Sequence, residues 1–433
     1  MCSSDLSDLY YADLVDSSGH FQSWDRDGNN LFGEIYREGV NWDEIDYHPD
    51  VYVARVPADT VAQVENYVTK VIRYEYRTTG KPWFRTMTFS AHDLMDWAPV
   101  ETMEAIATQL APQGFTYNRL YHNGLYASLP TAVPPTPLPS SDTPTPYPTP
   151  RPTDPLPTSD GDPLPAALTT AYTNGTGFHF HSGHGSLLSW GGESGVPVFT
   201  DADVAALNNQ DTLPIIFADS CETARFCPYI PYNDYLTASS GGSVQTAVDR
   251  YSIGTWICPE PAPLQWAAYN QDALGERFTV ASESGAIAYW GCSNTGERQS
   301  LVLGREFFAA YRPRVTLGEM WKQAIEAYYA NYRLFKYDRS YNGNNGDTWI
   351  FHHPERFLLF GDPSLRVGGV AGLPDDTTPP HTTHNVDHVW YRNEFTLVLT
   401  ATDTGCGVKQ THYRVGTGGW QEGETFTFSI PNN

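Results

Sequence analysis

The chain has 433 residues, with 26 lysines and arginines against 50 aspartates and glutamates, which gives a formal net charge of −24. Such acidity argues against a protein that binds nucleic acid or anionic membranes, because both partners require basic surfaces. The 18% charged and 14% aromatic residues exclude a broadly disordered chain. The length allows two or more domains, and the absence of a run of 18 apolar residues argues against a transmembrane helix.

Strands alternate with helices through most of the chain, which predicts an α/β layered fold with a largely parallel sheet. Hydrophobic periodicity places the strands at 50–56, 84–90, 116–121, 177–181, 213–218, 285–290 and 357–360. Helical spacing of apolar residues places the helices at 61–76, 99–110, 168–172, 201–207, 304–311 and 317–332.

A proline-rich segment at 130–165 interrupts this pattern, with 14 of the 33 prolines of the chain. It has no hydrophobic period, so we expect an extended, solvated, mobile segment that the fold does not need. The composition alone allows either a tether between two domains or a long surface loop within one domain.

The pattern changes again near residue 375. Alternating strands are expected at 395–402 and 410–415, with glycine and asparagine turns between them and no helical spacing. About 58 residues remain from this point, against about 100 in a complete immunoglobulin-like sandwich. We therefore predict a partial all-β module at 371–433, after an α/β region at 1–370.

Two predicted strands end in residues that suit nucleophilic catalysis. Gly183-His184-Gly185 follows one strand and Asp219-Ser220-Cys221 follows the next. Since reactive groups gather at the carboxyl ends of strands in open α/β sheets, the imidazole of His184 and the thiol of Cys221 should lie together. An imidazole favours the reactive thiolate form of a cysteine. The pattern equally allows an inert buried cysteine and a turn histidine.

The same region supports a different prediction. His179, His181 and His184 form an H-x-H-x-x-H pattern, in which the first two residues share a strand face and the third could complete a zinc site. Gly183 stands where the related motif of metallo-β-lactamases has an aspartate. A zinc-dependent hydrolase is therefore the alternative to a cysteine enzyme.

Several segments taken in order resemble the gingipain family of cysteine peptidases, which belongs to the caspase-like clan. The resemblance covers about residues 5 to 368, and its most specific part is Gly361-Asp-Pro-Ser-Leu-Arg366 near the end. The other segments that carry it are 7–14, 24–34, 50–57, 183–185, 218–221, 284–296 and 316–319. The resemblance implies a caspase-like α/β/α domain with two subdomains, at about 1–80 and 81–370. It also implies that the proline-rich segment is a loop of this domain.

The resemblance assigns roles to individual residues of a cysteine endopeptidase that acts through an acyl-enzyme. Cys221 would attack the scissile carbonyl, and His184 would be the general acid and base. The backbone N–H groups of Gly185 and Cys221 would form the oxyanion hole. Asp93, after the strand at 84–90, would orient the histidine. Catalysis of this kind requires no cofactor.

The segment from Asp25 to Glu34 spaces oxygen ligands like a calcium loop, through Asp25, Asp27 and Asn29. It is not an EF-hand, because loop position 12 is Tyr36 and Glu34 falls at position 10. The spacing allows a structural calcium site as well as a plain turn stabilised by aspartate.

The remaining features concern where the protein acts. No signal peptide is visible at the start, but the family has further sequence before residue 7, so we expect the native chain to begin earlier. The composition and the C-terminal module, which resembles bacterial surface repeats, indicate a secreted or cell-surface protein of a bacterium. The module would supply spacing or adhesion, and a non-catalytic adhesin is a further alternative. The six cysteines form no C-x-x-C pair, and they allow one or two disulfides.

Overall fold

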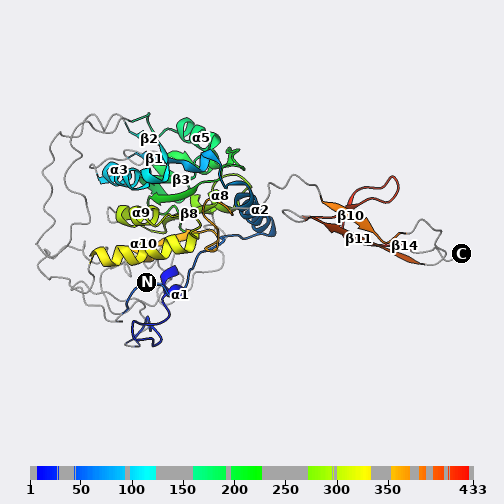
Figure 1. Ribbon diagram of the computed structural model, residues 1–433, viewed down its shortest axis with the longest axis horizontal. Helices are drawn as coiled ribbons and strands as arrows, with labels where there is room; N and C mark the ends of the chain where they lie inside the picture. The colour runs from blue at the N-terminus through cyan, green and yellow to red at the C-terminus, as the bar shows by residue number, and fades with distance from the viewer. Residues whose placement is uncertain are drawn as a thin grey trace, which may run out of the picture.

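The computed structural model describes residues 7–26, 28, 43, 45–92, 98–122, 159–191, 197–226, 272–294, 296, 300–332, 353–370, 380–386, 394–403, 408 and 410–428. Two parts stand apart in it: a large domain built on one sheet, and small antiparallel sheets near the C-terminus (Figure 1). Among the described helices, none is both long and apolar enough to cross a bilayer.

A six-stranded sheet forms the centre of the large domain, with the strand order β2-β1-β3-β7-β8-β9. The first five strands are parallel and β9 runs antiparallel at one edge, which confirms the predicted α/β class. The strands are β1 (Thr86–Ala91), β2 (Thr116–Tyr121), β3 (Phe178–Ser182), β7 (Ile215–Asp219), β8 (Ala288–Cys292) and β9 (Phe357–Phe360). β3 and β8 are buried throughout, as expected for parallel strands covered on both faces.

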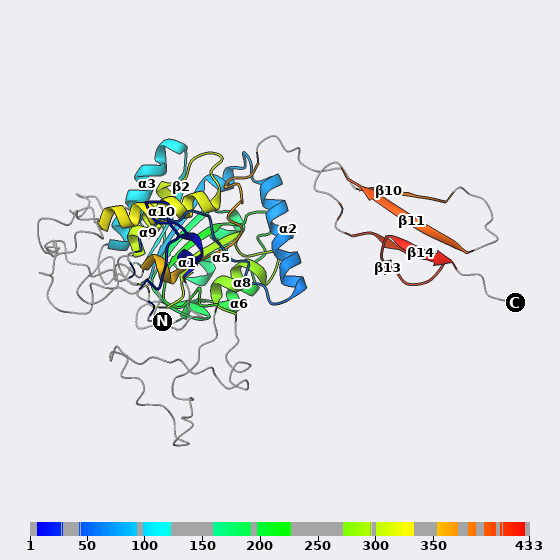
Figure 2. The ribbon, with the colours of Figure 1, turned by 90° about the horizontal axis from the view of Figure 1, so that it is seen from below.

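Helices cover both faces of this sheet (Figure 2). On one face, α3 (Ala98–Leu110), α9 (Ser300–Ala309) and α10 (Leu317–Tyr332) enclose the larger apolar cluster. On the other face, α5 (Pro165–Asn174), α6 (Asp201–Ala205) and α8 (Leu274–Val280) enclose the smaller one. A second small sheet of β4 (His184–Ser186), β5 (Ser189–Gly191) and β6 (Pro197–Thr200) contributes Trp190 and Phe199 to that smaller cluster. A short helix, α1 (Asp8–Ala12), precedes these elements.

The predicted helix at 61–76 is confirmed as α2 (Val61–Arg77), and a local signal accounts for its start. Thr60 and Gln63 form a capping box, in which each satisfies a backbone N–H of the other. The predicted strand at 50–56 is wrong: only Arg55 makes a bridge, to Phe360 of β9. The guanidinium of Arg55 is bound instead by the buried carboxylate of Asp8, with Nε 2.6 Å from Oδ1.

The end of the proline-rich segment is joined to the edge strand β2. The N–H of Asp160 donates to the carbonyl of Arg119, and the N–H of Arg119 donates to the carboxylate of Asp160, each at 2.7 Å. The hydroxyl of Ser159 lies 3.0 Å from the carbonyl of Tyr121. Helix α5 then begins at Pro165. Residues 159–165 are therefore part of the folded domain, and the rest of the predicted mobile segment lies outside the described residues.

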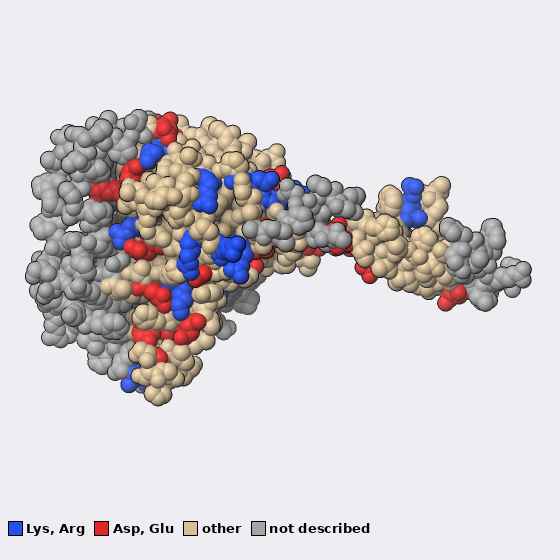
Figure 3. Space-filling view, in the orientation of Figure 1, with Lys and Arg blue, Asp and Glu red and all other residues tan. Residues whose placement is uncertain are grey.

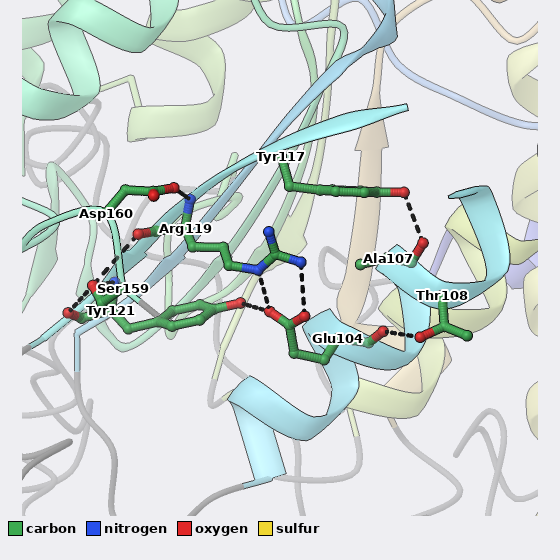
Figure 4. A network of polar contacts seen from close by, with 8 residues as sticks. All are labelled: Glu104, Ala107, Thr108, Tyr117, Arg119, Tyr121, Ser159 and Asp160. Carbon is green, nitrogen blue, oxygen red and sulfur yellow. Dashed lines mark hydrogen bonds and ion pairs between the residues drawn. The ribbon is translucent and has the colours of Figure 1, made fainter. Parts of the chain in front are cut away.

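A polar cluster on α3 and β2 fixes the edge of the sheet that β2 forms (Figure 4). Glu104 accepts two bonds from the guanidinium of Arg119, at 2.7 and 2.9 Å, and one from the hydroxyl of Tyr121 at 2.6 Å. A bidentate pair of this kind has a defined geometry as well as charge. It holds α3 against the strand to which Ser159 and Asp160 return.

Helix α2 is attached to α8 by a fully buried lysine. The ammonium of Lys70 donates to the carbonyls of Phe278, Thr279 and Ala286, at 2.9, 2.8 and 3.1 Å. Phe278 and Thr279 lie in the last turn of α8, whose carbonyls have no partner within the helix. Burial lowers the pKa of Lys70 well below its usual value. The lysine thus caps one helix from another.

The described C-terminal strands form small antiparallel sheets with no buried hydrophobic side chain. They are β10 (His381–His384), β11 (Phe395–Thr402), β12 (His412–Tyr413), β13 (Gln421–Glu422) and β14 (Thr425–Phe428). β11 matches the predicted strand and alternates between half-buried and exposed residues. The second predicted strand shortens to β12. The half-buried residues of β11 show that one face of its sheet is only partly covered, as expected for part of a sandwich.

We predict that Lys70→Met lowers the free energy of unfolding by about 3 kcal/mol, because the methionine fills the same space but removes the ammonium donor from three buried carbonyls. The carbonyl of Phe278 keeps the N–H of Ala286 as a donor. Urea unfolding followed by tryptophan fluorescence measures the change. Lys81→Met, at a half-buried position, is the control and should change it by less than about 1 kcal/mol. Equal stability of Lys70→Met and the wild type would contradict the capping role.

Candidate active site

The two predicted catalytic segments follow neighbouring strands. β3 and β7 pair in parallel, and their last paired residues are Ser182 and Asp219. One further backbone bond extends this pairing, from the N–H of Gly183 to the carbonyl of Asp219 at 3.1 Å. His184 and Cys221 come next on the two chains. The sheet therefore places both at its carboxyl edge, as the sequence predicted.

Cys221 lies on a tight turn immediately after β7. Glu222 has a φ of 61°, a left-handed backbone conformation that residues other than glycine rarely adopt. Its N–H donates to the carbonyl of Asn294 at 2.7 Å, and the N–H of Ala224 donates to that of Cys292 at 3.0 Å. These bonds to the loop after β8 fix the turn. The thiol of Cys221 is half-buried and lies 3.8 Å from the carbonyl of Gly296.

His184 is exposed at the start of the β4–β5 hairpin, where it pairs with Gly191. A Cβ atom on Gly191 would lie 3.2 Å from the Cβ of His184, so the hairpin backbone closely contacts the histidine. From the β7 side, the hydroxyl of Ser220 lies 3.0 Å from the carbonyl of Gly183 and 3.3 Å from that of His184. The residue before the cysteine thus binds the backbone of the histidine loop.

Gly185 brings the two segments into direct contact. A Cβ atom on Gly185 would lie 2.4 Å from the carbonyl oxygen of Cys221 and 2.8 Å from its nitrogen, so no larger residue fits there. The backbone of Gly185 therefore lies against that of Cys221.

The histidines of β3 do not form the predicted zinc site. Both ring nitrogens of His179 are engaged, Nδ1 at 2.6 Å from the hydroxyl of Tyr172 and Nε2 at 2.8 Å from that of Ser90. His181 lies beside it in the buried interior, whereas His184 is exposed. Burial lowers the pKa of His179 to about 3, and it lowers the pKa of His181 well below its usual value. Within the described residues, no group of three or more His, Cys, Asp or Glu is placed to hold a metal.

Other predicted residues fall partly outside the description. Asp93 lies outside the described residues, as do the predicted calcium ligands Asp27, Asn29 and Glu34, whereas Asp25 is described. Of the cysteines that the structure describes, neither Cys221 nor Cys292 forms a disulfide. The predicted orienting role of Asp93 therefore stays a prediction.

A second polar cluster near the nucleophile was not predicted. The carboxylate of Asp219 accepts from the hydroxyl of Ser182 at 2.8 Å and from that of Ser300 at the start of α9. The Asp219 carboxylate thus connects the ends of β3 and β7 with the first turn of α9. The sequence offered one sign, an acidic residue at the end of an otherwise apolar strand.

The sequence model of Peptidase family C25 matches residues 3–368. The crystal structure of the Arg-specific cysteine proteinase gingipain R has 14% identity and a TM-score of 0.47, over 89% of this chain and 70% of that chain. The complex of the Porphyromonas gingivalis RgpB pro- and mature domains has 14% identity and a TM-score of 0.45, over 81% of this chain and 64% of that chain. A search of curated proteins found no match.

We predict that Gly185→Ala lowers kcat/KM for peptide hydrolysis by at least about a hundredfold, because the added methyl group would force Gly185 and Cys221 apart. Hydrolysis of a fluorogenic peptide library gives the rate. Gly419→Ala is the control, since its Cβ would meet no atom within 4 Å and the residue lies in the C-terminal module. A Gly185→Ala enzyme with full activity would refute the contact.

Proposed function

Because this chain belongs to Peptidase family C25, a family of cysteine peptidases, we propose that Cys221 is its nucleophile and His184 its general acid and base. The single observation that supports this assignment is the contact of Gly185 with the backbone of Cys221, where β3 and β7 end side by side. It brings a thiol, an imidazole and two backbone N–H groups to one edge of the sheet.

The proposed reaction follows from these groups. The thiolate of Cys221 attacks the carbonyl carbon of the scissile peptide bond, and the N–H groups of Gly185 and Cys221 stabilise the oxyanion that forms. His184 then gives a proton to the departing amine, which leaves a thioester on Cys221. Water, deprotonated by His184, attacks the thioester and releases the carboxylic acid. Exposure of His184 at the hairpin start leaves it accessible to the substrate.

The substrates of such an enzyme are proteins and peptides. On the face shown in Figure 3, basic and acidic side chains are interspersed over the sheet domain. We further propose that the enzyme acts outside the cell or at its surface. The C-terminal strands, which stand apart from the sheet domain, would attach it to a surface or space it from one.

A structural calcium ion near Asp25 is part of the proposal. The side chain of Trp24 donates to the carbonyl of Asp13 at 3.3 Å, so Asp13 and Asp25 belong to neighbouring segments. Both carboxylate oxygens of Asp13 are buried, and the backbone of Tyr47 and the side chain of Asp46 lie beside them. Burial, with Asp46 and Asp50 nearby, raises the pKa of Asp13 to about 8. We propose this carboxylate as an oxygen ligand of such a cation.

We predict that Cys221→Ala abolishes both peptide hydrolysis and labelling by a cysteine-directed covalent probe, while the far-ultraviolet circular dichroism stays that of the wild type. Cys292→Ala is the control, because Cys292 is fully buried, and it should keep the labelling. Hydrolysis by Cys221→Ala that a zinc chelator stops would instead support a metal enzyme. Failure of the wild type to hydrolyse or label would support the non-catalytic alternative.

We predict that calcium raises the melting temperature of the wild type by several degrees at pH 8 and by less at pH 5. The folded-state pKa of Asp13 lies above its unfolded value, so without calcium its contribution to stability is lost as pH rises toward 8. Bound calcium reverses this loss, because it needs the ionised carboxylate.

Asp13→Asn tests this calcium effect. The variant should lose most of the calcium-dependent rise, yet be no less stable than the wild type in chelator at pH 8. Asp16→Asn, at a neighbouring half-buried position, should respond to calcium like the wild type. Differential scanning calorimetry with calcium or EDTA supplies the comparison. If calcium does not change the melting temperature of the wild type, the calcium site at Asp13 is excluded.

A further inference from the structure

A row of buried polar side chains lies behind the loop that carries His184. The hydroxyl of Ser90 on β1 lies 2.8 Å from Nε2 of His179 and 2.8 Å from Nδ1 of His181. Tyr172 of α5 lies 2.6 Å from the other nitrogen of His179. Because Ser90 has one proton to donate, it donates to one imidazole and accepts from the other, which couples the tautomers of the two histidines.

The row ends at two imidazoles that we call the histidine floor, His92 and His181. Their ring centroids are 5.7 Å apart, and each residue is at most 1% exposed. Nε2 of each ring lacks a hydrogen-bond partner among the described residues. Among the described residues, these two nitrogens therefore add no hydrogen bond to the core, although a buried polar atom without one is costly.

The histidine floor contacts the backbone directly before His184. A Cβ atom on Gly183 would lie 3.4 Å from Nε2 of His181 and 3.1 Å from the Cβ of His92. The N–H of His92 also donates to the carbonyl of Ser182 at 3.0 Å. The chain thus rests on the floor at the two positions that lead into the catalytic histidine.

His181 supports His184 along a second route. Its ring stacks on Trp190, with centroids 4.2 Å apart and an interplanar angle of 17°. The next residue, Gly191, pairs with His184 and contacts its Cβ. On the opposite side, Ser220 binds the carbonyls of Gly183 and His184. The backbone at Gly183 and His184 is therefore held between the histidine floor on one side and Ser220 on the other.

We propose that His92 and His181 are positioning residues for His184, and that the hydroxyl of Ser90 holds the ring of His181 in the orientation that supports the catalytic loop. This inference rests on the proposed function. It assigns the row a role in the placement of the imidazole against the thiol, where a misplacement of about 1 Å costs as much as a hundredfold in rate.

Two variants on the same strand and face separate positioning from stability. Ser90→Ala removes the hydroxyl that holds His181. Thr88→Val removes a hydroxyl that is equally buried, which donates to Thr176 at 3.0 Å and lies outside the row. We expect Ser90→Ala to lower kcat on the order of tenfold with KM unchanged within about twofold, and Thr88→Val to keep both. The rate of Cys221 alkylation by iodoacetamide should fall with kcat, because it reports the pairing of thiol and imidazole.

The outcomes decide between distinct conclusions. If Ser90→Ala and Thr88→Val lose activity only in proportion to their folded fraction, with wild-type kcat and alkylation per folded molecule, the row is structural and the inference is wrong. If Ser90→Ala does not fold, His181→Gln, which keeps a polar group near Nε2 but not the bond to Ser90, is measured in the same two ways. A wild type that neither hydrolyses peptides nor alkylates at Cys221 would refute the proposed function itself.

Discussion

The proposed active site depends on the backbone pairing of β3 with β7. Ser182 and Asp219 are the last residues of that pairing, and His184 and Cys221 each stand two residues further along. Equal distance from a shared ladder places the two chains level with each other, with no side-chain contact required to align them. Parallel hydrogen bonds therefore provide the coarse geometry, and the glycines of the His-Gly segment allow the final approach.

The coarse geometry was also the part that sequence could predict. A buried parallel strand is recognised in a sequence by a continuous apolar run. A reactive residue just after such a strand lies at the carboxyl edge of the sheet. The surroundings of β3 could not be predicted in this way. His179 and His181 do share a strand face, but the side chains that surround them come from Tyr172, Ser90 and Trp190, on three other elements. Spacing along one strand carries no information about such partners.

Other errors have equally physical causes. The segment at 50–56 alternates like a strand, yet it is fixed by packing and by the pair of Arg55 with Asp8 rather than by a ladder. Tyr52, for example, packs closely against Gly318: a Cβ atom added to Gly318 would lie only 2.6 Å from the Cβ of Tyr52. The strands β4, β5 and β6 span only three or four residues each, which is too short for a period to be recognised. One of these short strands, β4, nevertheless carries His184, the proposed general acid and base.

The return of the chain to β2 has a consequence for how the proline-rich segment can vary. The chain leaves the sheet after Tyr121 and is bound again at Ser159, whose hydroxyl lies 3.2 Å from the nitrogen and 3.0 Å from the carbonyl of that same tyrosine. Exit and entry thus coincide, so the intervening residues close a loop across a fixed, short gap. The entropy of closing such a loop grows only with the logarithm of its length, about 0.6 kcal/mol for each doubling. Insertions or deletions of many residues at this point are thus nearly neutral for folding, and the sheet edge can accommodate a graft of almost any size.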